Sequence, residues 1–117
     1  MSFRGGRNVA MKVPPHRWEA TVAFYENTLG LAVRRREPAS VAFEFGPCVL
    51  WIDRVEQLSQ AEVWLEVIAD DVAGAGKHLA DAATVRCDGI EALPSDLQGF
   101  WIVNPADVVH LVARTDD

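Results

Sequence analysis

Residues 8–13 read NVAMKV and residues 62–67 read EVWLEV, and this pattern, which occurs twice, decides the fold. In both stretches every second residue is apolar, which is typical of a strand that packs one face against a core. Each stretch is followed by apolar residues at helical spacing, first over 17–29 and then over 72–82. Short strand-like stretches come after each helix. We therefore predict two similar halves, each with the order strand, helix, strand, strand, strand.

The strands that follow the two helices are short and separated by turn residues. They are expected at 32–36, 40–45 and 48–52 in the first half and at 84–87, 100–103 and 108–113 in the second. Gly30 is expected to end the first helix, and residues 104–107 to form the last turn. The 117 residues are thus expected to form one α+β domain, with a first module over about 7–55 and a second over about 61–114.

The composition excludes several functions. Seventeen acidic and eleven basic residues give a net charge of −6, the wrong sign for a surface that binds nucleic acid. We interpret the run Arg34 to Arg36 as a solvated strand edge. Cys48 and Cys87 lack the spacing of a zinc or redox motif. No apolar run has the length of a signal peptide or a membrane span, so we expect a cytoplasmic protein without a membrane partner.

The strand alternation predicts which residues face away from the helices. In the last strand, Val109 and Leu111 are expected under the helix while His110 points away. Two exposed indoles on a polar face would be a large uncovered apolar surface, so we expect a ligand or a second subunit to cover this face. The residues predicted to lie on this face are Asn8, Lys12, Trp51, Glu62, Trp64, Glu66 and His110.

Three stretches make the chain resemble a known family: residues 8–13, the segment AFYENTLGL at 23–31, and FWIVNP at 100–105 with the strand after it. They are similar to the vicinal oxygen chelate superfamily, which includes glyoxalases, bleomycin resistance proteins and extradiol dioxygenases. The resemblance implies that each βαβββ module curves into part of an open, barrel-like mixed sheet with the helices on its outer face. It also implies a site enclosed by the two halves, and a homodimer.

The resemblance further implies four metal ligands, on the first and last strands of each half. These positions are held by Asn8, Trp51, Glu62 and His110. An indole has no lone pair to offer a metal, so Trp51 removes one ligand. Glu62 and His110 stay as weak candidates together with Asn8, and a two-residue shift in register would bring in the Asp53 carboxylate. No cofactor is therefore expected, with a divalent metal as the alternative.

Two functions fit these residues. The first is a protein similar to bleomycin resistance proteins that binds a planar or cationic small molecule, with Trp51 and Trp64 for stacking and Glu62 and Glu66 for charge. Asn8 and Lys12 would complete this binding site. The second is a metal-dependent lyase or isomerase resembling glyoxalases, with Glu62 and His110 as catalytic residues. An extradiol dioxygenase is disfavoured because its iron needs two histidines, and only His110 lies on a predicted strand. A third alternative is an interaction module whose mixed face is covered by another protein.

Overall fold

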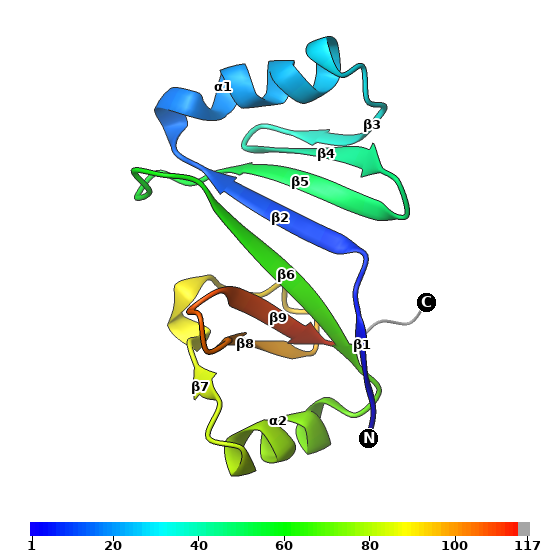
Figure 1. Cartoon of the computed structure of the whole chain (residues 1–117), viewed down its shortest axis with the longest axis vertical. Coiled ribbons are helices and arrows are strands. Elements are labelled where there is room, and N and C mark those ends of the chain that lie inside the picture. Colours follow the sequence, from blue (N-terminus) through cyan, green and yellow to red (C-terminus); the bar gives the residue numbers. More distant parts are fainter. Residues whose placement is uncertain (115–117) are drawn as a thin grey trace. The chain divides into compact units, whose positions relative to one another are not determined.

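The computed structural model describes residues 1–114, and they form two compact units. The first-half unit is Arg7–Trp64, and the second-half unit combines Met1–Gly6 with the chain from Leu65 onward. Each unit holds strands paired in both directions and a helix packed on one face of its sheet (Figure 1). The predicted α+β class with two tandem βαβββ modules is therefore confirmed.

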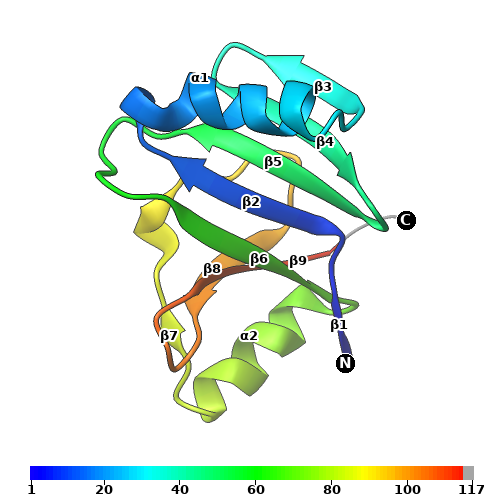
Figure 2. The ribbon, with the colours of Figure 1, turned by 45° about the horizontal axis from the view of Figure 1, so that its top comes forward.

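In the first-half unit the strands pair in the order β3, β4, β5, β2 and the start of β6. Strand β2 runs parallel to β5 and antiparallel to β6, and both pairings can be followed in Figure 2. The elements are β2 (Asn8–Val13), α1 (Pro15–Ala23), η1 (Phe24–Thr28), β3 (Val33–Glu37), β4 (Ser40–Phe45), β5 (Cys48–Arg54) and β6 (Glu62–Ala69).

The first helix begins at Pro15, two residues before its predicted start, because proline is well suited to the first turn of a helix. Its last turn, η1, is a π-helix in which Leu29 N donates to Phe24 O at 2.9 Å. Gly30 then takes a positive φ of 68°, and the N–H of Leu31 donates a hydrogen bond to Tyr25 O. The prediction that Gly30 ends the helix is therefore confirmed.

The core of the first-half unit lies between α1 and the sheet. Tyr25 packs on Phe43 with ring centroids 5.9 Å apart. Phe24, the aromatic residue next to it in the chain, instead stays 46% exposed. Only one of the two adjacent aromatic residues therefore fills the space between helix and sheet. The buried members of this core are Val13, Val22, Val41, Phe43, Leu50 and Ile52.

In the second-half unit the strands pair in the order β1, β6, β9, β8 and β7. Strand β6 is parallel to β9, as β2 is to β5 in the other unit. The three-residue strand β1 is an addition that the sequence did not predict, since so short a stretch has no periodicity. The elements are β1 (Phe3–Gly5), α2 (Val72–Asp81), β7 (Val85–Arg86), η2 (Asp88–Ile90), β8 (Gly99–Val103) and β9 (Val109–Ala113).

Helix α2 forms despite its glycines because its start is capped. The Asp71 carboxylate accepts from Gly74 N at 3.0 Å. A Cβ at position 74 would lie 2.3 Å from an oxygen of that carboxylate, so glycine makes room for the cap. The helix then packs on the sheet through Val72, Ala75 and Leu79.

Strand β1 pairs with β6, and Asp70 in addition holds Ser2 at the start of this strand, a contact that predicts a pH dependence. The Ser2 backbone N–H donates to Asp70 at 2.7 Å, and this bond lowers the pKa of the carboxyl below its usual value of 3.8, with help from the Ser2 hydroxyl. A lowered pKa stabilises the fold above the unfolded-state value, and this gain is lost as the pH falls through the folded-state value. We expect Asp70→Asn to speed amide exchange in β1 at pH 7. The difference from wild type should vanish near pH 2, and a difference that persists there would contradict this assignment.

The basic run lies on the edge strand β3. Arg34, Arg35 and Arg36 each lie within 4 Å of a glutamate, so this run is a solvated strand edge, as the sequence indicated.

Within residues 1–114, no helix has both the length and the apolar character needed to span a bilayer.

Candidate functional site

The face of the first-half sheet that points away from α1 carries two rows of side chains across four strands. Val9, Met11 and Val13 pack toward the α1 core, which confirms the predicted phase of β2. The alternate residues of β2 therefore lie on the other face with their partners on β4, β5 and β6. The strand register sets the polar row as Ser40, Asp53, Lys12 and Glu62, and the tryptophan row as Ala42, Trp51, Ala10 and Trp64.

The polar row is organised around Lys12, whose ammonium group is almost out of contact with solvent. Lys12 is 4% exposed, and its Nζ lies 2.8 Å from Asp53 Oδ2. The other oxygen of Asp53 accepts from the Ser40 hydroxyl at 2.5 Å. Lys12 Nζ also lies 4.3 Å from the centre of the Trp64 ring. The charge of Lys12 is thus balanced by a carboxylate and an aromatic face.

The two indoles of the tryptophan row are both held by hydrogen bonds to their side-chain neighbours. Trp51 Nε1 donates to Asn8 Oδ1 at 2.8 Å. Trp64 Nε1 donates to Glu62 Oε1 at 3.4 Å, a longer and weaker bond. These contacts set the plane of each ring before any ligand arrives.

Exposure divides the predicted binding residues of this unit into two groups. Lys12 and Trp64, at 4% and 6% exposed, are buried although they lie on the same face as Trp51. Asn8 and Glu62 are exposed and Trp51 is half-buried, so these three are within reach of a small molecule. Ser40 and Asp53 were not predicted as part of such a network. The sequence pattern that could have placed Asp53 in this network is the alternation of β5, which puts Asp53 on the same face as Trp51.

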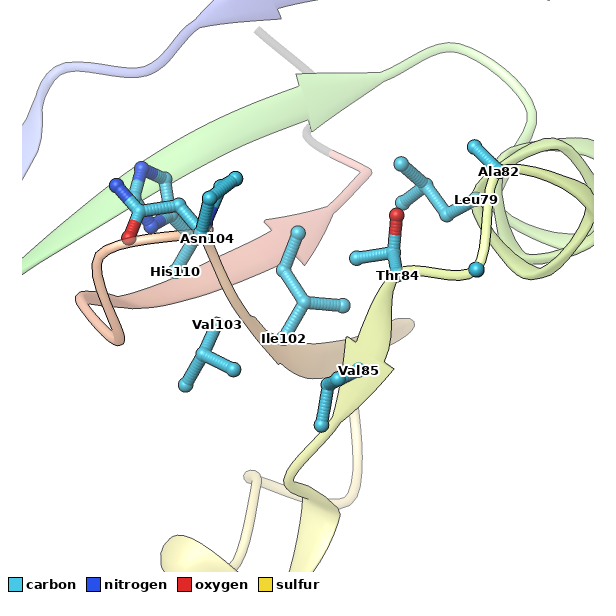
Figure 3. Close-up of a pocket in the computed structure, with 10 residues that line it drawn as sticks. Leu79, Ala82, Thr84, Val85, Ile102, Val103, Asn104 and His110 are labelled. Atoms are coloured by element: carbon cyan, nitrogen blue, oxygen red, sulfur yellow. The ribbon is translucent and has the colours of Figure 1, made fainter.

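His110 lies on the face opposite to the one predicted. In β9, Val112 belongs to the core under α2, and His110 shares its side of the strand because the two are two residues apart. Its register partner Ile102 lies in the same core. The predicted phase of this last strand is therefore wrong by one residue, and Leu111 faces away from the helix. His110 instead lines a pocket beside the end of α2 (Figure 3).

Glu66 lies on the non-helical face of the second-half unit, as predicted, because Val67 beside it packs under α2. Its backbone carbonyl accepts from Gly6 N at 2.8 Å. A Cβ at position 6 would lie 2.2 Å from Glu66 Oε1, so Gly6 allows strand β1 to pass close to this carboxylate. The side chain of Glu66 is packed along the chain that leads out of β1.

The residues at the four positions implied for a metal do not fit one. The Asn8 oxygen already accepts the Trp51 N–H, and that indole presents a hydrogen where a ligand needs a lone pair. The predicted substitute Asp53 is bonded to Lys12 and Ser40. His110 faces the α2 side of its own sheet. Within residues 1–114, no three His, Cys, Asp or Glu side chains are grouped so that they can hold a metal ion.

Cys87 shows no sign of an activated thiol. Burial raises the pKa of the Cys87 thiol above its usual value of 9.0, and the neighbouring Asp88 carboxylate adds to this rise. A raised pKa means less of the nucleophilic thiolate at neutral pH. The raised pKa therefore disfavours a reactive thiol at Cys87.

No protein-family model matches the chain, and no curated protein matches it significantly in sequence. Solved structures do match it in shape. A Mn(II)-bound glyoxalase from Novosphingobium aromaticivorans has a TM-score of 0.67 at 19% identity, over 92% of this chain and 38% of that one. A methylmalonyl-CoA epimerase from Mycobacterium tuberculosis has a TM-score of 0.68 at 10% identity, over 97% of this chain and 89% of that one. A glyoxalase/bleomycin resistance protein/dioxygenase superfamily member from Vibrio splendidus has a TM-score of 0.66 at 11% identity, over 97% of this chain and 100% of that one.

These likenesses define the class of fold. The chain has the vicinal oxygen chelate fold of the glyoxalase, bleomycin resistance and dioxygenase superfamily, as its sequence indicated. It spans well under half the length of the glyoxalase that it matches, and the whole length of the Vibrio protein. At such identities the comparison defines the scaffold, and this scaffold serves many unrelated functions.

Proposed function

We propose that this protein binds a small aromatic cation on the non-helical face of its first-half unit, without a metal site of the family type. The surroundings of Trp51 carry this proposal. Its register neighbours on both flanking strands are alanines, Ala10 and Ala42, so no large side chain stands directly beside the ring in its own row. The half-buried indole, fixed by Asn8, is thus a stacking surface flanked in its row by two small side chains, of which Ala42 is fully buried.

Charge supports a cation as the ligand. The Lys12 ammonium is already paired with Asp53, whereas the Glu62 carboxylate is exposed on the same face. The chain as a whole carries a net charge of −6, which attracts cations over a longer range. An indole and a carboxylate on one face are complementary to a ligand that joins a ring to a positive charge.

Replacing Trp51 with alanine is expected to weaken the binding of benzyltrimethylammonium by about tenfold, because one cation–π or stacking contact is worth about 1–2 kcal/mol. Isothermal titration calorimetry at low salt measures this loss. Glu62→Gln should weaken binding and reduce its salt dependence, whereas the matched change Glu19→Gln, on an exposed residue of α1, should do neither. Equal affinities for wild type and Trp51→Ala would contradict the proposal.

The alternative of a metal-dependent lyase or isomerase is kept because the fold also occurs in a Mn(II)-bound glyoxalase. From the donor atoms described above, we expect that Mn²⁺, Ni²⁺ and Zn²⁺ leave the thermal midpoint of this protein unchanged. An ion that binds the folded state alone stabilises it by about 2.7 kcal/mol at one hundred times its dissociation constant. A stabilisation of that size that Glu62→Gln abolishes would favour the enzyme over the binding protein.

The homodimer, the cytoplasmic location and the module limits of about 7–55 and 61–114 stay predictions. Sedimentation equilibrium tests the first of these. A dimer that persists without ligand would support the expectation that a second subunit covers the non-helical face. It would also be compatible with the alternative of an interaction module.

A further inference from the structure

A pocket of about 520 Å³ opens beside the C-terminal end of α2, between the strand-like stretch at β7 and the turn that joins β8 to β9 (Figure 3). It lies wholly within the second-half unit and on the helical side of the sheet, so it is separate from the proposed cation site. Its volume falls in the range of small-molecule sites. Most of its wall is apolar, formed by side chains that include Leu79, Val85, Ile102 and Val103.

One end of this pocket carries an oriented histidine. His110 Nδ1 lies 3.0 Å from the Val108 carbonyl oxygen. A carbonyl oxygen only accepts, so Nδ1 carries the hydrogen of this bond. The neutral imidazole then has its lone pair on Nε2, which makes that atom a hydrogen-bond acceptor. The pocket therefore has an acceptor at a wall residue whose tautomer is set by the turn behind it.

Asn104 lies at the same end of the pocket as His110. Its Oδ1 accepts from Ala106 N and from Val108 N, each at 2.9 Å, which fixes the side-chain oxygen toward the turn. The amide NH₂ group is then the other, donating end of this side chain. The Val108 carbonyl also accepts from Asn104 N at 3.0 Å, so the same carbonyl anchors both polar residues. Figure 3 shows Asn104 and His110 at one end of the pocket and Leu79 and Ala82 at the other.

From this arrangement we infer that the pocket binds a small apolar hydroxyl compound, of the phenol class and about the size of a two-ring aromatic. The ligand hydroxyl donates to His110 Nε2 and accepts from the Asn104 amide, while its rings lie against the aliphatic wall. A carboxylate of the same size fits less well, since it has no hydrogen for Nε2 and meets a chain of net charge −6.

The test is equilibrium dialysis of the full chain at pH 8 with 2-naphthol, 2-methoxynaphthalene, naphthalene and 2-naphthoate. We expect 2-naphthol to bind most tightly, by about tenfold over the methoxy compound, because a buried acceptor left without a donor is costly. His110→Phe keeps a ring but loses the acceptor, so it should remove this preference and leave naphthalene binding unchanged. His16→Phe, on an exposed residue of α1, is the matched control and should change neither.

A second pair of variants keeps the inference testable if His110→Phe does not fold. Ala82→Phe places a ring at the far wall of the pocket and should abolish binding of all four compounds, whereas Ala80→Phe, outside the pocket on the same helix, should leave binding intact. Three results would overturn the inference: no binding of 2-naphthol to wild type, equal binding of naphthol and methoxynaphthalene, or tightest binding of the carboxylate. None of these bears on the cation site of the other unit.

Discussion

Lys12→Met is expected to lower the free energy of unfolding by about 3 kcal/mol, close to the largest effect of any single change on the non-helical face. Removing the ammonium leaves the Asp53 carboxylate, 19% exposed in its side chain, with the Ser40 hydroxyl as its partner in the polar row. It also removes the cation from the face of the Trp64 ring. A buried charge that has lost its partner is far more costly than the pair itself was stabilising. Urea unfolding followed by circular dichroism measures the loss.

An exposed ion pair of the same length is the control for this prediction. Lys77 and Asp81 also lie 2.8 Å apart, but their side chains are 79% and 67% exposed. Lys77→Met should therefore change the free energy of unfolding by no more than about 0.5 kcal/mol. In addition, the double variant Lys12→Met with Asp53→Leu should be more stable than Lys12→Met alone, because it removes the stranded carboxylate. If the two lysine variants were destabilised equally, the burial of Lys12 would not be the cause.

Phe43→Ala is expected to cost about 3–5 kcal/mol, because the ring is 0% exposed and its removal leaves a cavity under α1. The lost contacts include the one with Tyr25, on the turn that ends the helix. Since this cavity would lie between η1 and the sheet, we also expect faster amide exchange in β3, β4 and η1. Chemical denaturation and hydrogen exchange together measure both effects.

The neighbouring aromatic provides a control from the same unit. Phe24 stays 46% exposed and contacts Tyr25 edge to face, with ring centroids 5.2 Å apart. We expect Phe24→Ala to cost about 1 kcal/mol or less. A loss for Phe24→Ala as large as that for Phe43→Ala would mean that both aromatics of the AFYENTLGL segment fill the core, contrary to the structure.

The candidate site was predictable where one face of a strand is apolar and the other polar. That is the case for β2, so the placement of Asn8 and Lys12 away from α1 followed from local alternation. It is not the case for β9, whose residues 109–113 read VHLVA. Val109 and Val112 lie on opposite faces and are both buried, so the apolar pattern fits either phase of the strand. The predicted phase of β9 was wrong, and His110 lies on the helical side of the sheet.

The chemistry of individual residues was less predictable than their faces. Lys12 was predicted as a ligand-binding residue. In the structure its ammonium group donates a hydrogen bond to Asp53, which lies 41 positions along the chain. Asn104 was interpreted as a turn residue only, and its hydrogen bonds across the turn fix its side-chain oxygen beside the pocket. Such partners are brought together by strand pairing and leave no trace in local spacing.

The order of elements, the repeat of two βαβββ modules and the class of fold follow from local patterns, because alternation, helical spacing and helix stops such as Gly30 act within a few residues of the chain. The burial of Lys12 and Trp64, the place of Trp51 between alanines and the position of His110 in a pocket beside α2 depend instead on tertiary contacts. Burial, ion pairing and the phase of a strand with two apolar faces are set by neighbours distant in the chain, and these neighbours are defined only once the strands have paired.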